Sequence, residues 1–440
     1  MLRSVKENRR NLSLKEQLDL YGYTFQSNLF GKIEVFTAEP QNLRTIFAAD
    51  FKNFGVEPMR LFVFGPLLGE GVMTTDGASW AHSRALLQPV FSRTQITDCS
   101  AFEIHVTRLI DQLPRDGSTV DLQLLFAKLA LDSSSEFLFG ESLKLLSATP
   151  TSGAQTFWHN YGYAQRGVGR RLQLPRWNVF TRDTKFWDSC AAARKFVEQY
   201  VDKALSRHPE KESDRAILAY GLSKITKDRN KIRNQLLNVF LPAHDAIAVL
   251  LTNVFFNLAR HPDVWSRLRE EILELGHDEL TFERVKALTF LQYVIKETLR
   301  LFPTVGSVGR VALRDTTIPT GGGELGTSSI LIRKGDSVRT SFYALHRRKD
   351  LYGENAELFD PKRWAKLDPP RWSYLPFGGG PRVCPGQHLG IAETSYAIVR
   401  ILQTFQGIEN RDPVNEFVEN YKITTESKNG AKVCLIPVEE

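Results

Sequence analysis

The sequence is poor in cysteine. Its 440 residues include only four cysteines, Cys99, Cys190, Cys384 and Cys434, which lie far apart and show no paired spacing. This pattern argues against a disulfide framework and against a zinc cluster, and it fits a reducing compartment. A cysteine with a function in this chain therefore acts without a neighbouring cysteine.

Long apolar runs are also missing. No uninterrupted stretch reaches the about 18 residues that a membrane-spanning helix needs. The first residues, MLRSVKENRRNLSLKEQLDLYG, are basic and amphipathic and lack the apolar core of a signal peptide. We therefore expect this chain to carry no membrane anchor and to be soluble and cytoplasmic as it stands.

Linkers, repeats and charge blocks are absent as well. No tract of Pro, Gly or Ser divides the chain, so we expect one domain over residues 1–440. The net charge is +7, but the basic residues are scattered, and the densest cluster is HRRKD at 346–350. A nucleic-acid binder would need a basic stripe with interleaved aromatic residues, so we expect no nucleic-acid partner.

The hydrophobic pattern predicts a mainly α protein with small β-sheets at both chain ends. A strand hairpin is expected over 23–37, followed by a helix that opens near Pro40. Long amphipathic stretches near 80–112, 122–140, 184–206, 229–260 and 283–301 predict helices. After Pro303 short strands and glycine turns follow, then a helix over 387–405 and a strand-like segment over 420–437.

Cys384 has an unusual neighbourhood. In YLPFGGGPRVCPGQHLGIAE (374–393) three consecutive glycines, an arginine and two prolines surround it, and a helix begins directly afterwards. Glycines let a backbone approach a flat ligand closely, and a helix N-terminus favours the thiolate that ligates metal. A core cysteine would need none of these features. A cysteine nucleophile partnered by His388 is the other interpretation of the pattern.

This loop resembles the haem-binding loop of the cytochrome P-450 superfamily at every fixed position: Phe377, Gly380, Arg382, Cys384 and Gly386. The resemblance implies haem b as cofactor, Cys384 as the thiolate ligand of the iron, and Arg382 as a partner of a haem propionate. It also implies the fold of that superfamily, a triangular prism that holds the haem between a long central helix and the cysteine loop.

Further segments lie where the superfamily has them. Glu297 and Arg300, three residues apart on one helix face, and Arg363 in FDPKRW match a triad that supports the haem loop. We interpret this triad as structural.

Four residues resemble propionate-binding positions of the family. Trp80 and Arg84 match the spacing of a propionate-binding helix, with His82 as a possible helper. Arg310, in GSVGRVALRDTTIP, resembles the propionate-binding arginine that follows the triad helix. A plain exposed strand arginine is the alternative interpretation of Arg310.

The central helix carries a departure from the family. In LPAHDAIAVL (241–250), Asp245 matches the acid that delivers protons, and His244 is its variable neighbour. Ala246 stands where the family has the threonine that steadies the reduced oxygen. Pro242 cannot donate to the carbonyl of Asn238, which predicts a kink. The alternative for Asp245 and His244 is a buried pair that satisfies only itself.

The chain most resembles yeast and filamentous-fungal alkane and fatty-acid hydroxylases, for example in RDTTIPTGGGE and WSYLPFGGGPRVCPGQ. Those enzymes carry an N-terminal membrane anchor, so a form with such an anchor would lie on the cytoplasmic side of the endoplasmic reticulum. By family position we expect an apolar pocket. Its lining segments are 62–73, which we expect to be a loop, 157–168, 240–250, 304–309 and 424–427.

The resemblance therefore implies a haem-thiolate monooxygenase that inserts one atom of O₂ into a hydrophobic small molecule, in fungal lipid or secondary metabolism. A flavoprotein reductase that uses NADPH would supply its electrons, and we expect a monomer. Because the threonine is missing, two alternatives stay open: an isomerase, dehydratase or peroxygenase that acts on a peroxide, and a haem sensor or carrier without turnover.

Overall fold

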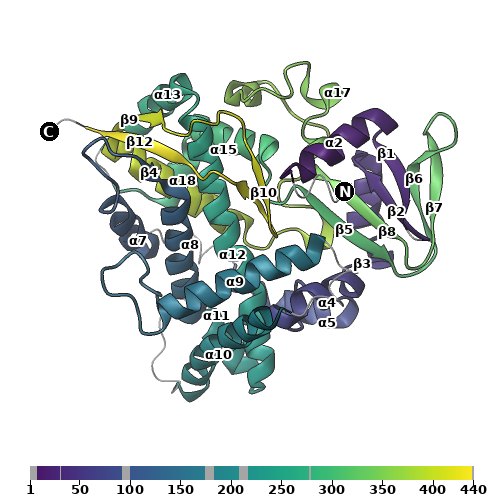
Figure 1. The fold of residues 1–440 in the computed structure, drawn as a ribbon, viewed down its shortest axis with the longest axis horizontal. Helices are drawn as coiled ribbons and strands as arrows, with labels where there is room; N and C mark the ends of the chain where they lie inside the picture. The colour runs from purple at the N-terminus through teal and green to yellow at the C-terminus, as the bar shows by residue number, and fades with distance from the viewer. Residues whose placement is uncertain are drawn as a thin grey trace.

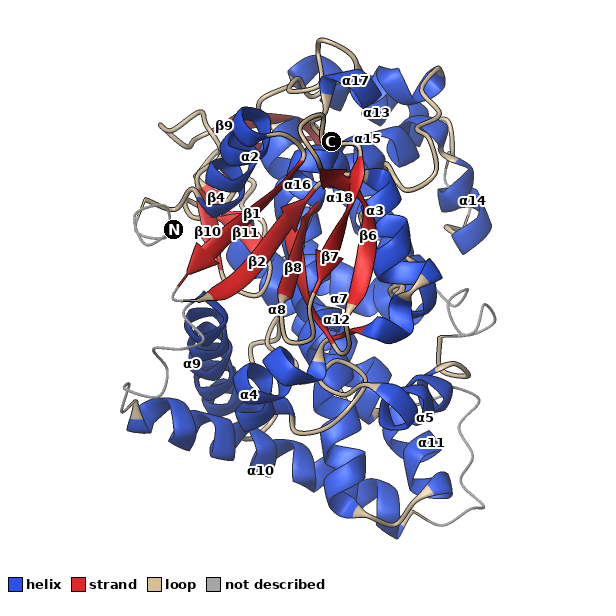
Figure 2. Ribbon diagram, turned by 90° about the vertical axis from the view of Figure 1, so that its right-hand side faces the viewer, coloured by secondary structure: helices blue, strands red, loops and turns tan. Residues whose placement is uncertain are grey.

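The computed structural model describes residues 7–29, 31–91, 100–173, 183–207, 217–276 and 279–438. Helices make up most of the described chain and four small sheets accompany them, which confirms the predicted mainly α class. In Figure 1 the strands of the largest sheet lie at the right-hand edge, and the long helices fill the centre and left. Figure 2 shows this sheet above a lower layer that is almost entirely helical.

The helices follow one another along the whole chain. The α-helices are α2 (Arg10–Tyr21), α3 (Pro40–Arg44), α4 (Glu57–Leu68), α5 (Gly77–Leu87), α7 (Ser100–Ile110), α8 (Leu122–Phe139), α9 (Ala154–Gln173), α10 (Thr184–Ser206), α11 (Leu218–Ile225), α12 (Arg229–Leu258), α13 (Pro262–Leu273), α14 (Phe282–Ala287), α15 (Thr289–Leu301), α16 (Phe342–Leu345), α17 (Lys349–Tyr352) and α18 (Gln387–Thr404). A short π-helix (Thr45–Ala49) and 3₁₀ turns at Phe51–Asn53, Pro361–Ala365 and Gly380–Arg382 complete the set.

The strands form small, mostly antiparallel sheets. They are β1 (Thr24–Leu29), β2 (Lys32–Thr37), β3 (Phe54–Gly55), β4 (Val120–Asp121), β5 (Ser307–Ala312), β6 (Thr316–Gly322), β7 (Ser328–Ile332), β8 (Ser337–Ser341), β9 (Phe405–Asn410), β10 (Glu419–Tyr421), β11 (Thr425–Ser427) and β12 (Lys432–Pro437). The largest sheet has the order β1-β2-β8-β5-β3, and its β2–β8 pair is parallel. This sheet joins the N-terminal hairpin to strands nearly 300 positions later in the chain, and so brings Arg310 of β5 next to the first third of the chain.

Several predicted boundaries need correction. The stretch 80–112 contains two helices, α5 and α7, and the stretch 283–301 contains α14 and α15. Segment 62–73, predicted as a loop, is helical up to Leu68, because α4 continues through Pro66. The hairpin, the proline at the start of α3 and the last helix are as predicted. Periodicity detects helical stretches well but does not show where short turns interrupt them.

Helix α12 crosses the middle of the molecule (Figure 1). Its N-cap Asp228 accepts hydrogen bonds from the amides of Asn230 and Lys231. Its apolar residues up to Leu241 pack in one hydrophobic cluster, and those from Ile247 onward pack in another. The five residues between these clusters are PAHDA, so the polar pair lies where one core ends and the next begins.

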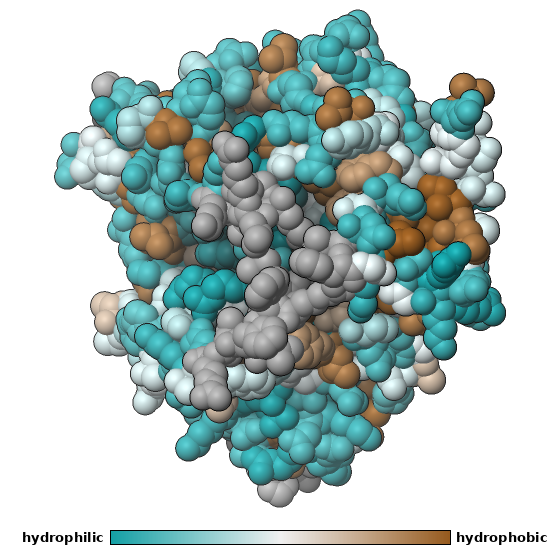
Figure 3. Space-filling model, turned by 45° about the vertical axis from the view of Figure 1, so that its right-hand side comes forward, coloured by the Kyte–Doolittle hydropathy of each residue, from teal (hydrophilic) through white to brown (hydrophobic). Residues whose placement is uncertain are grey.

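Among the described residues, α12 is also the one helix long and apolar enough to cross a membrane. Its most apolar window is 83% buried inside the protein, as expected for a core helix. On the face in Figure 3 hydrophilic residues predominate, and hydrophobic residues form separate small groups. Large exposed hydrophobic side chains are scattered over different elements, among them Phe62, Trp187 and Leu325.

Candidate functional site

In the loop around Cys384, one position has a backbone conformation and a close contact that only glycine permits. The amide of Cys384 donates to the carbonyl oxygen of Phe377 at 3.1 Å, which closes the loop before α18 begins. Gly380 has a φ of 67°, and a Cβ there would lie 1.9 Å from the carbonyl oxygen of Phe47. Any side chain at Gly380 would therefore separate the loop from the π-helix at Thr45–Ala49. The predicted Phe377 packs at the edge of the main hydrophobic cluster.

The thiol of Cys384 lies half-buried at the end of this loop. Burial raises its pKa, while the amide of Gly386 and the nearby Arg84 guanidinium act to lower it. The glycine-rich loop and the start of α18 act to lower the pKa of Cys384, as predicted, but the opposite effect of burial is larger. We expected a lowered pKa, and this expectation is wrong for the protein without a ligated metal. Deprotonation is then coupled to metal binding, as is usual for a thiolate ligand.

Arg382 connects the cysteine loop to the start of α5. Its Nη2 donates to Asp76 Oδ1 at 2.6 Å and to the carbonyl oxygen of Thr75 at 2.8 Å. Its guanidinium lies 4.5 Å from the ring centroid of Trp80, a cation–π contact. Burial lowers the pKa of Arg382 to about 10. Its Nε is fully buried and has no hydrogen-bond partner among the described residues, so this arginine has a donor available for a further acceptor.

Arg310 is buried rather than exposed, with 7% of its surface accessible, although it lies on a strand. One of its nitrogens, Nη1, donates to the carbonyl oxygen of Gly309. Burial, Arg60 and Arg382 all lower its pKa, and Asp76 opposes them. The exposed-strand interpretation of Arg310 is therefore wrong.

Together these side chains form a cationic cluster, in which Arg310 is buried and Arg60, Arg84 and Arg382 are partly buried. Arg60, Arg84, Arg310 and Arg382 influence one another's charge, and the acidic residues that face them are Asp76 and Glu57. Four cations against two anions leave an excess of two positive charges in a partly buried region, which is costly unless anions compensate it. The two propionates of haem b are such anions, so the donor set fits the cofactor that the cysteine loop implies.

The remaining predicted propionate residues divide into two groups. Arg84 lies beside the cysteine loop: burial lowers its pKa, and the Cys384 charge raises it. Trp80 packs edge-on against Phe51 and under Arg382. His82 is exposed on α5, and no contact of the described residues brings it to the cluster.

The predicted triad is present and complete. Glu297 Oε1 accepts from Arg363 Nε at 2.8 Å and from Arg300 Nη2 at 2.8 Å, and Oε2 accepts from Trp364 Nε1 at 3.0 Å. Arg300 is fully buried and also donates to the carbonyl oxygens of His346 and Ala356. The triad therefore fixes α15 to the segment that precedes the cysteine loop.

The central helix has one open face. Between Leu236 and Leu258 every residue is buried except Pro242, Ala243 and Ala246. Residues of an α-helix follow at about 100°, so these three lie on one side. Helix α18 packs beside it, with Gly390 next to Ile247. The helix continues through Pro242 without interruption, and the kink expected there stays a prediction.

Asp245 and His244 lie on different sides of α12. Asp245 is at the edge of the open face, and its Oδ2 accepts a hydrogen bond of 2.6 Å from Thr424 Oγ1. His244 points to the opposite side, where Nδ1 donates to the carbonyl oxygen of Phe240 at 2.7 Å and the ring packs against Tyr161. Burial lowers the pKa of His244. The two residues are therefore not hydrogen-bonded to each other.

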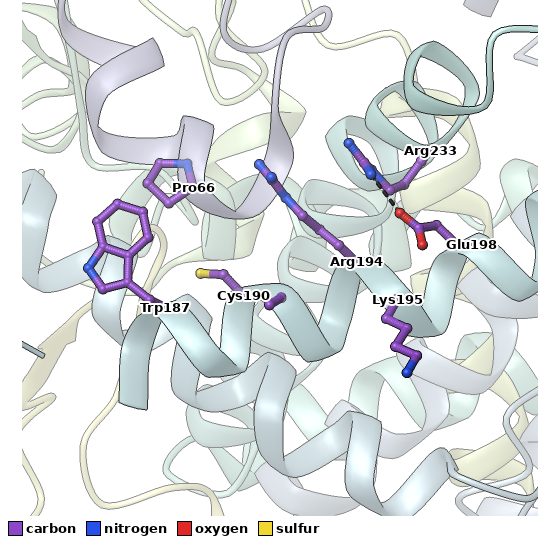
Figure 4. A pocket seen from close by; sticks show the side chains of 8 residues that line it. Pro66, Trp187, Cys190, Arg194, Lys195, Glu198 and Arg233 are labelled. Atoms are coloured by element: carbon purple, nitrogen blue, oxygen red, sulfur yellow. Dashed lines mark hydrogen bonds and ion pairs between the residues drawn. The ribbon is translucent and has the colours of Figure 1, made fainter. Parts of the chain in front are cut away.

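A cavity of about 450 Å³ lies elsewhere, between α4, α10 and α12 (Figure 4). Three of its four charged residues are already bonded: Arg233 Nη1 donates to Glu198 Oε1 at 2.6 Å, and Arg194 Nε donates to the carbonyl oxygen of Leu67 at 3.2 Å. Burial raises the pKa of Cys190 to about 12, so this thiol stays protonated. Among the described residues no group of three His, Cys, Asp or Glu side chains could hold a metal.

Sequence analysis missed four residues of the site. Arg60 and Asp76 belong to the cationic cluster, Thr424 hydrogen-bonds to Asp245, and Tyr161 packs against His244. Thr424 and Tyr161 were part of the predicted pocket segments 424–427 and 157–168, but only the fold shows which residues of α12 they meet. Arg60 and Asp76 have no motif of their own, so no local signal could have identified them.

Comparisons with known proteins identify the family and the fold. The family model described as Cytochrome P450 matches residues 3–434. Among curated relatives, "Cytochrome P450 monooxygenase himC" from Aspergillus japonicus is 38% identical over 96% of this chain and 78% of its own length. "Cytochrome P450 52A1" from Candida tropicalis is 39% identical over 87% of this chain and 74% of its own length. A crystal structure of the cytochrome P450DA heme domain has a TM-score of 0.84 at 20% identity, and covers 100% of this chain and 95% of that one.

Proposed function

The chain belongs to the cytochrome P450 family, and from this premise we propose that it is a haem-thiolate monooxygenase, which inserts one atom of O₂ into a hydrophobic substrate. The observation that carries the proposal is the family match over residues 3–434, together with relatives named monooxygenases. The family uses haem b. The peroxide-dependent alternatives and the haem sensor are not favoured by these findings.

We propose that Cys384 holds the iron through its Sγ atom and that Arg310 and Arg382 hold the propionates, with Trp80 supporting Arg382 from below. The excess of two positive charges in the cluster supports this assignment, and so does the unpartnered Nε of Arg382. Arg60 and Arg84 add to the same field. Haem b, when bound, supplies the iron that activates O₂.

The open face of α12 would border the space in which O₂ reacts with the substrate when haem b is bound. Ala243 and Ala246 are small, so they leave room for O₂ and for the carbon atom that is oxidised. Asp245 lies at the edge of this face and serves as the acid that delivers protons to reduced oxygen. His244 contacts Phe240 and Tyr161 on the far side of the helix, so it stabilises the packing of α9 on α12 in this proposal.

Monooxygenases of this family take electrons from a redox partner. We propose a flavoprotein reductase that uses NADPH and docks at the face near Cys384, and a location on the cytoplasmic side of the endoplasmic reticulum. We further propose that residues 1–440 act as one catalytic domain, since a single heme-domain structure covers 100% of this chain, and that the protein acts as a monomer.

The substrate proposed for this pocket is a medium or large apolar molecule, such as a fatty acyl chain or an apolar fungal metabolite. Gly306 and Gly309 do not provide space for this substrate, because the side chains of Asn11 and Met59 pack directly against them.

The test is the carbon-monoxide difference spectrum of the reduced protein, followed by turnover of a panel of alkanes, fatty acids and larger apolar metabolites. Each substrate is incubated with NADPH and reductase or with hydrogen peroxide alone. A thiolate-type spectrum and turnover that requires NADPH are expected. Turnover with peroxide alone would contradict the proposal, and so would an absent thiolate-type spectrum.

A further inference from the structure

A buried hydrogen bond connects the centre of α12 to the C-terminal hairpin. Thr424, in the turn between β10 and β11, donates from Oγ1 to Asp245 Oδ2 at 2.6 Å. The two residues are 179 positions apart in the chain, and each is more than nine-tenths buried. A hydroxyl that donates to a buried carboxylate makes a short and strong bond.

Helix α12 cannot supply such a hydroxyl from its own sequence. Ala246 follows the acid directly, and the nearest hydroxyl further along the helix is that of Thr252. Thr252 Oγ1 already donates to the carbonyl oxygen of Ala248 at 2.7 Å, within the same helix. The hydroxyl that reaches Asp245 therefore comes from another part of the chain.

We propose that Thr424 is a positioning residue that replaces the hydroxyl missing from α12, and that the C-terminal hairpin is thereby part of the proton-delivery route. The inference rests on the proposed function of Asp245. A hydroxyl can donate and accept at the same time. When a proton leaves the Asp245 carboxyl group, the Thr424 proton replaces it, and the Thr424 oxygen takes a proton from a neighbouring water that solvent protonates in turn. One proton therefore moves inward for each proton that leaves, and no charge stays on the threonine or on the water.

A second buried carboxyl group, that of Glu426, lies near this bond. Glu426, on β11, is buried, pairs with Lys422 and accepts from Asn420 Nδ2 at 2.7 Å. Burial raises the pKa of Glu426, and the Asp245 charge acts in the same direction, so the two carboxyl groups are close. Buried polar groups without protein partners are the usual places for ordered water.

Helix α9 contributes Tyr161, whose ring packs against His244 of α12. Burial raises the pKa of Tyr161 well above its usual value, and the Asp245 charge adds to this effect. Its hydroxyl is fully buried and meets no hydrogen-bond partner in the described part of the chain. One turn further on, the amide nitrogen Nε2 of Gln165 is buried without a partner as well. Further along α9, Gly169 packs against Lys422 of the hairpin.

The bond is not needed to hold the hairpin in place. The amide of Thr425 donates to the carbonyl oxygen of Thr304 at 2.9 Å, and Asn11 Nδ2 donates to Thr425 Oγ1 at 3.0 Å. Glu419, on β10, accepts from the amides of Asn11 and Leu12. Removal of the Thr424 hydroxyl should therefore leave the hairpin folded, and this makes its chemical role testable.

The experiment compares T424V, T424S, D245N and T252V as haem-loaded proteins. T252V is the matched control, because it also removes a buried threonine hydroxyl from this region. Product and hydrogen peroxide formed per NADPH are measured with reductase, together with KM and the solvent deuterium isotope effect. For T424V we expect product per NADPH to fall about 10-fold or more with KM unchanged, recovery to within about 2-fold in T424S, and no change in T252V.

A second readout needs no turnover. The infrared band of carbon monoxide bound to the reduced haem responds to hydrogen-bond donors near it, so it should shift in T424V and D245N but not in T252V. Wild-type coupling and an unshifted band in T424V, with D245N impaired, would overturn the role of Thr424 and leave the proposed function intact. Equal losses in T424V, T424S and T252V would also overturn it, since they would indicate a structural defect. A protein without a thiolate-type spectrum would overturn the proposed function itself.

Discussion

The two sides of the cofactor site are built in opposite ways. On the side of Cys384, Glu297 bonds to two arginines and a tryptophan, and Gly380 fits against Phe47 with no space for another atom. On the side of α12, Ala243 and Ala246 are partly open, and a single hydrogen bond from Thr424 holds the acid. The first side is a rigid support, and the second is adjustable. Changes to the support should remove the cofactor, and changes to α12 should alter the reaction while the cofactor stays.

The largest effect is expected from C384S. Serine oxygen is not a thiolate, so the thiolate-type spectrum of the reduced carbon-monoxide complex should vanish completely while some haem stays bound. The pyridine haemochrome assay measures haem content separately from the ligand. C190S, which changes the protonated thiol in the cavity of Figure 4, is the matched control and should keep the spectrum. An unchanged spectrum in C384S would remove the basis of the site assignment.

The second prediction concerns the triad. E297A leaves Arg300 buried without its carboxylate, and breaking a buried pair in this way costs about 3–5 kcal/mol. We expect haem-free or insoluble protein, measured by soluble yield and by thermal unfolding. E354A removes an exposed ion pair with Lys349 and should cost about 1 kcal/mol or less. Haem-loaded, stable E297A that lacks only turnover would show that the triad is not a support.

The third prediction addresses the adjustable side. D245N keeps the shape of the side chain but removes its acidic proton, so the rate with O₂ should fall by about 10²- to 10⁴-fold. Haem content and thermal stability should stay near those of the wild type. NADPH oxidation and product formation are followed under one set of conditions. If D245N loses its haem instead, α12 belongs to the rigid support and the comparison fails.

A fourth prediction concerns a buried carboxyl group on the rigid side, which should make stability depend on pH. Glu393 of α18 is buried, its Oε1 accepts from Ser133 Oγ, and burial raises its pKa to about 7. A carboxyl group with a raised pKa stabilises the fold while it is protonated, and this stability is lost as the pH rises through about 7. The loss between pH about 4.5 and 7 is on the order of 3 kcal/mol. Denaturant unfolding across this range should show the slope in wild type and a flatter one in E393Q.

The smallest effect is expected from A246T. It restores a hydroxyl on the open face, where the side chain has room, so stability should change by less than about 1 kcal/mol. Hydrogen peroxide released per NADPH should fall with poorly fitting substrates and change little with the best one. The same substitution in the T424V background should recover part of the lost coupling. If coupling does not recover in the double variant, the hydroxyl at position 246 cannot take over the role of the Thr424 hydroxyl.

The comparison also explains what the sequence could predict. The cysteine loop and the triad are short patterns, so the sequence predicts Cys384, Arg382, Glu297 and Arg363, and the structure confirms the contacts of the triad. The mainly α class and the long helix 229–258 followed from hydrophobic periodicity.

Other residues of the site could not be found in this way. Arg60 and Asp76 join the cationic cluster only because β5 pairs beside the N-terminal segment, and Thr424 reaches Asp245 only through the position of the hairpin. Contacts between distant segments leave no local pattern in a single chain.

The difference in packing has a consequence for mutational tolerance. At Gly380 every substitution must move the backbone of Phe47, so this position offers no neutral change. At Ala243 and Ala246 a larger side chain enters open space and leaves both hydrophobic cores of α12 untouched. Variation in this enzyme should therefore accumulate within one turn of α12, where a new substrate preference costs the fold almost nothing.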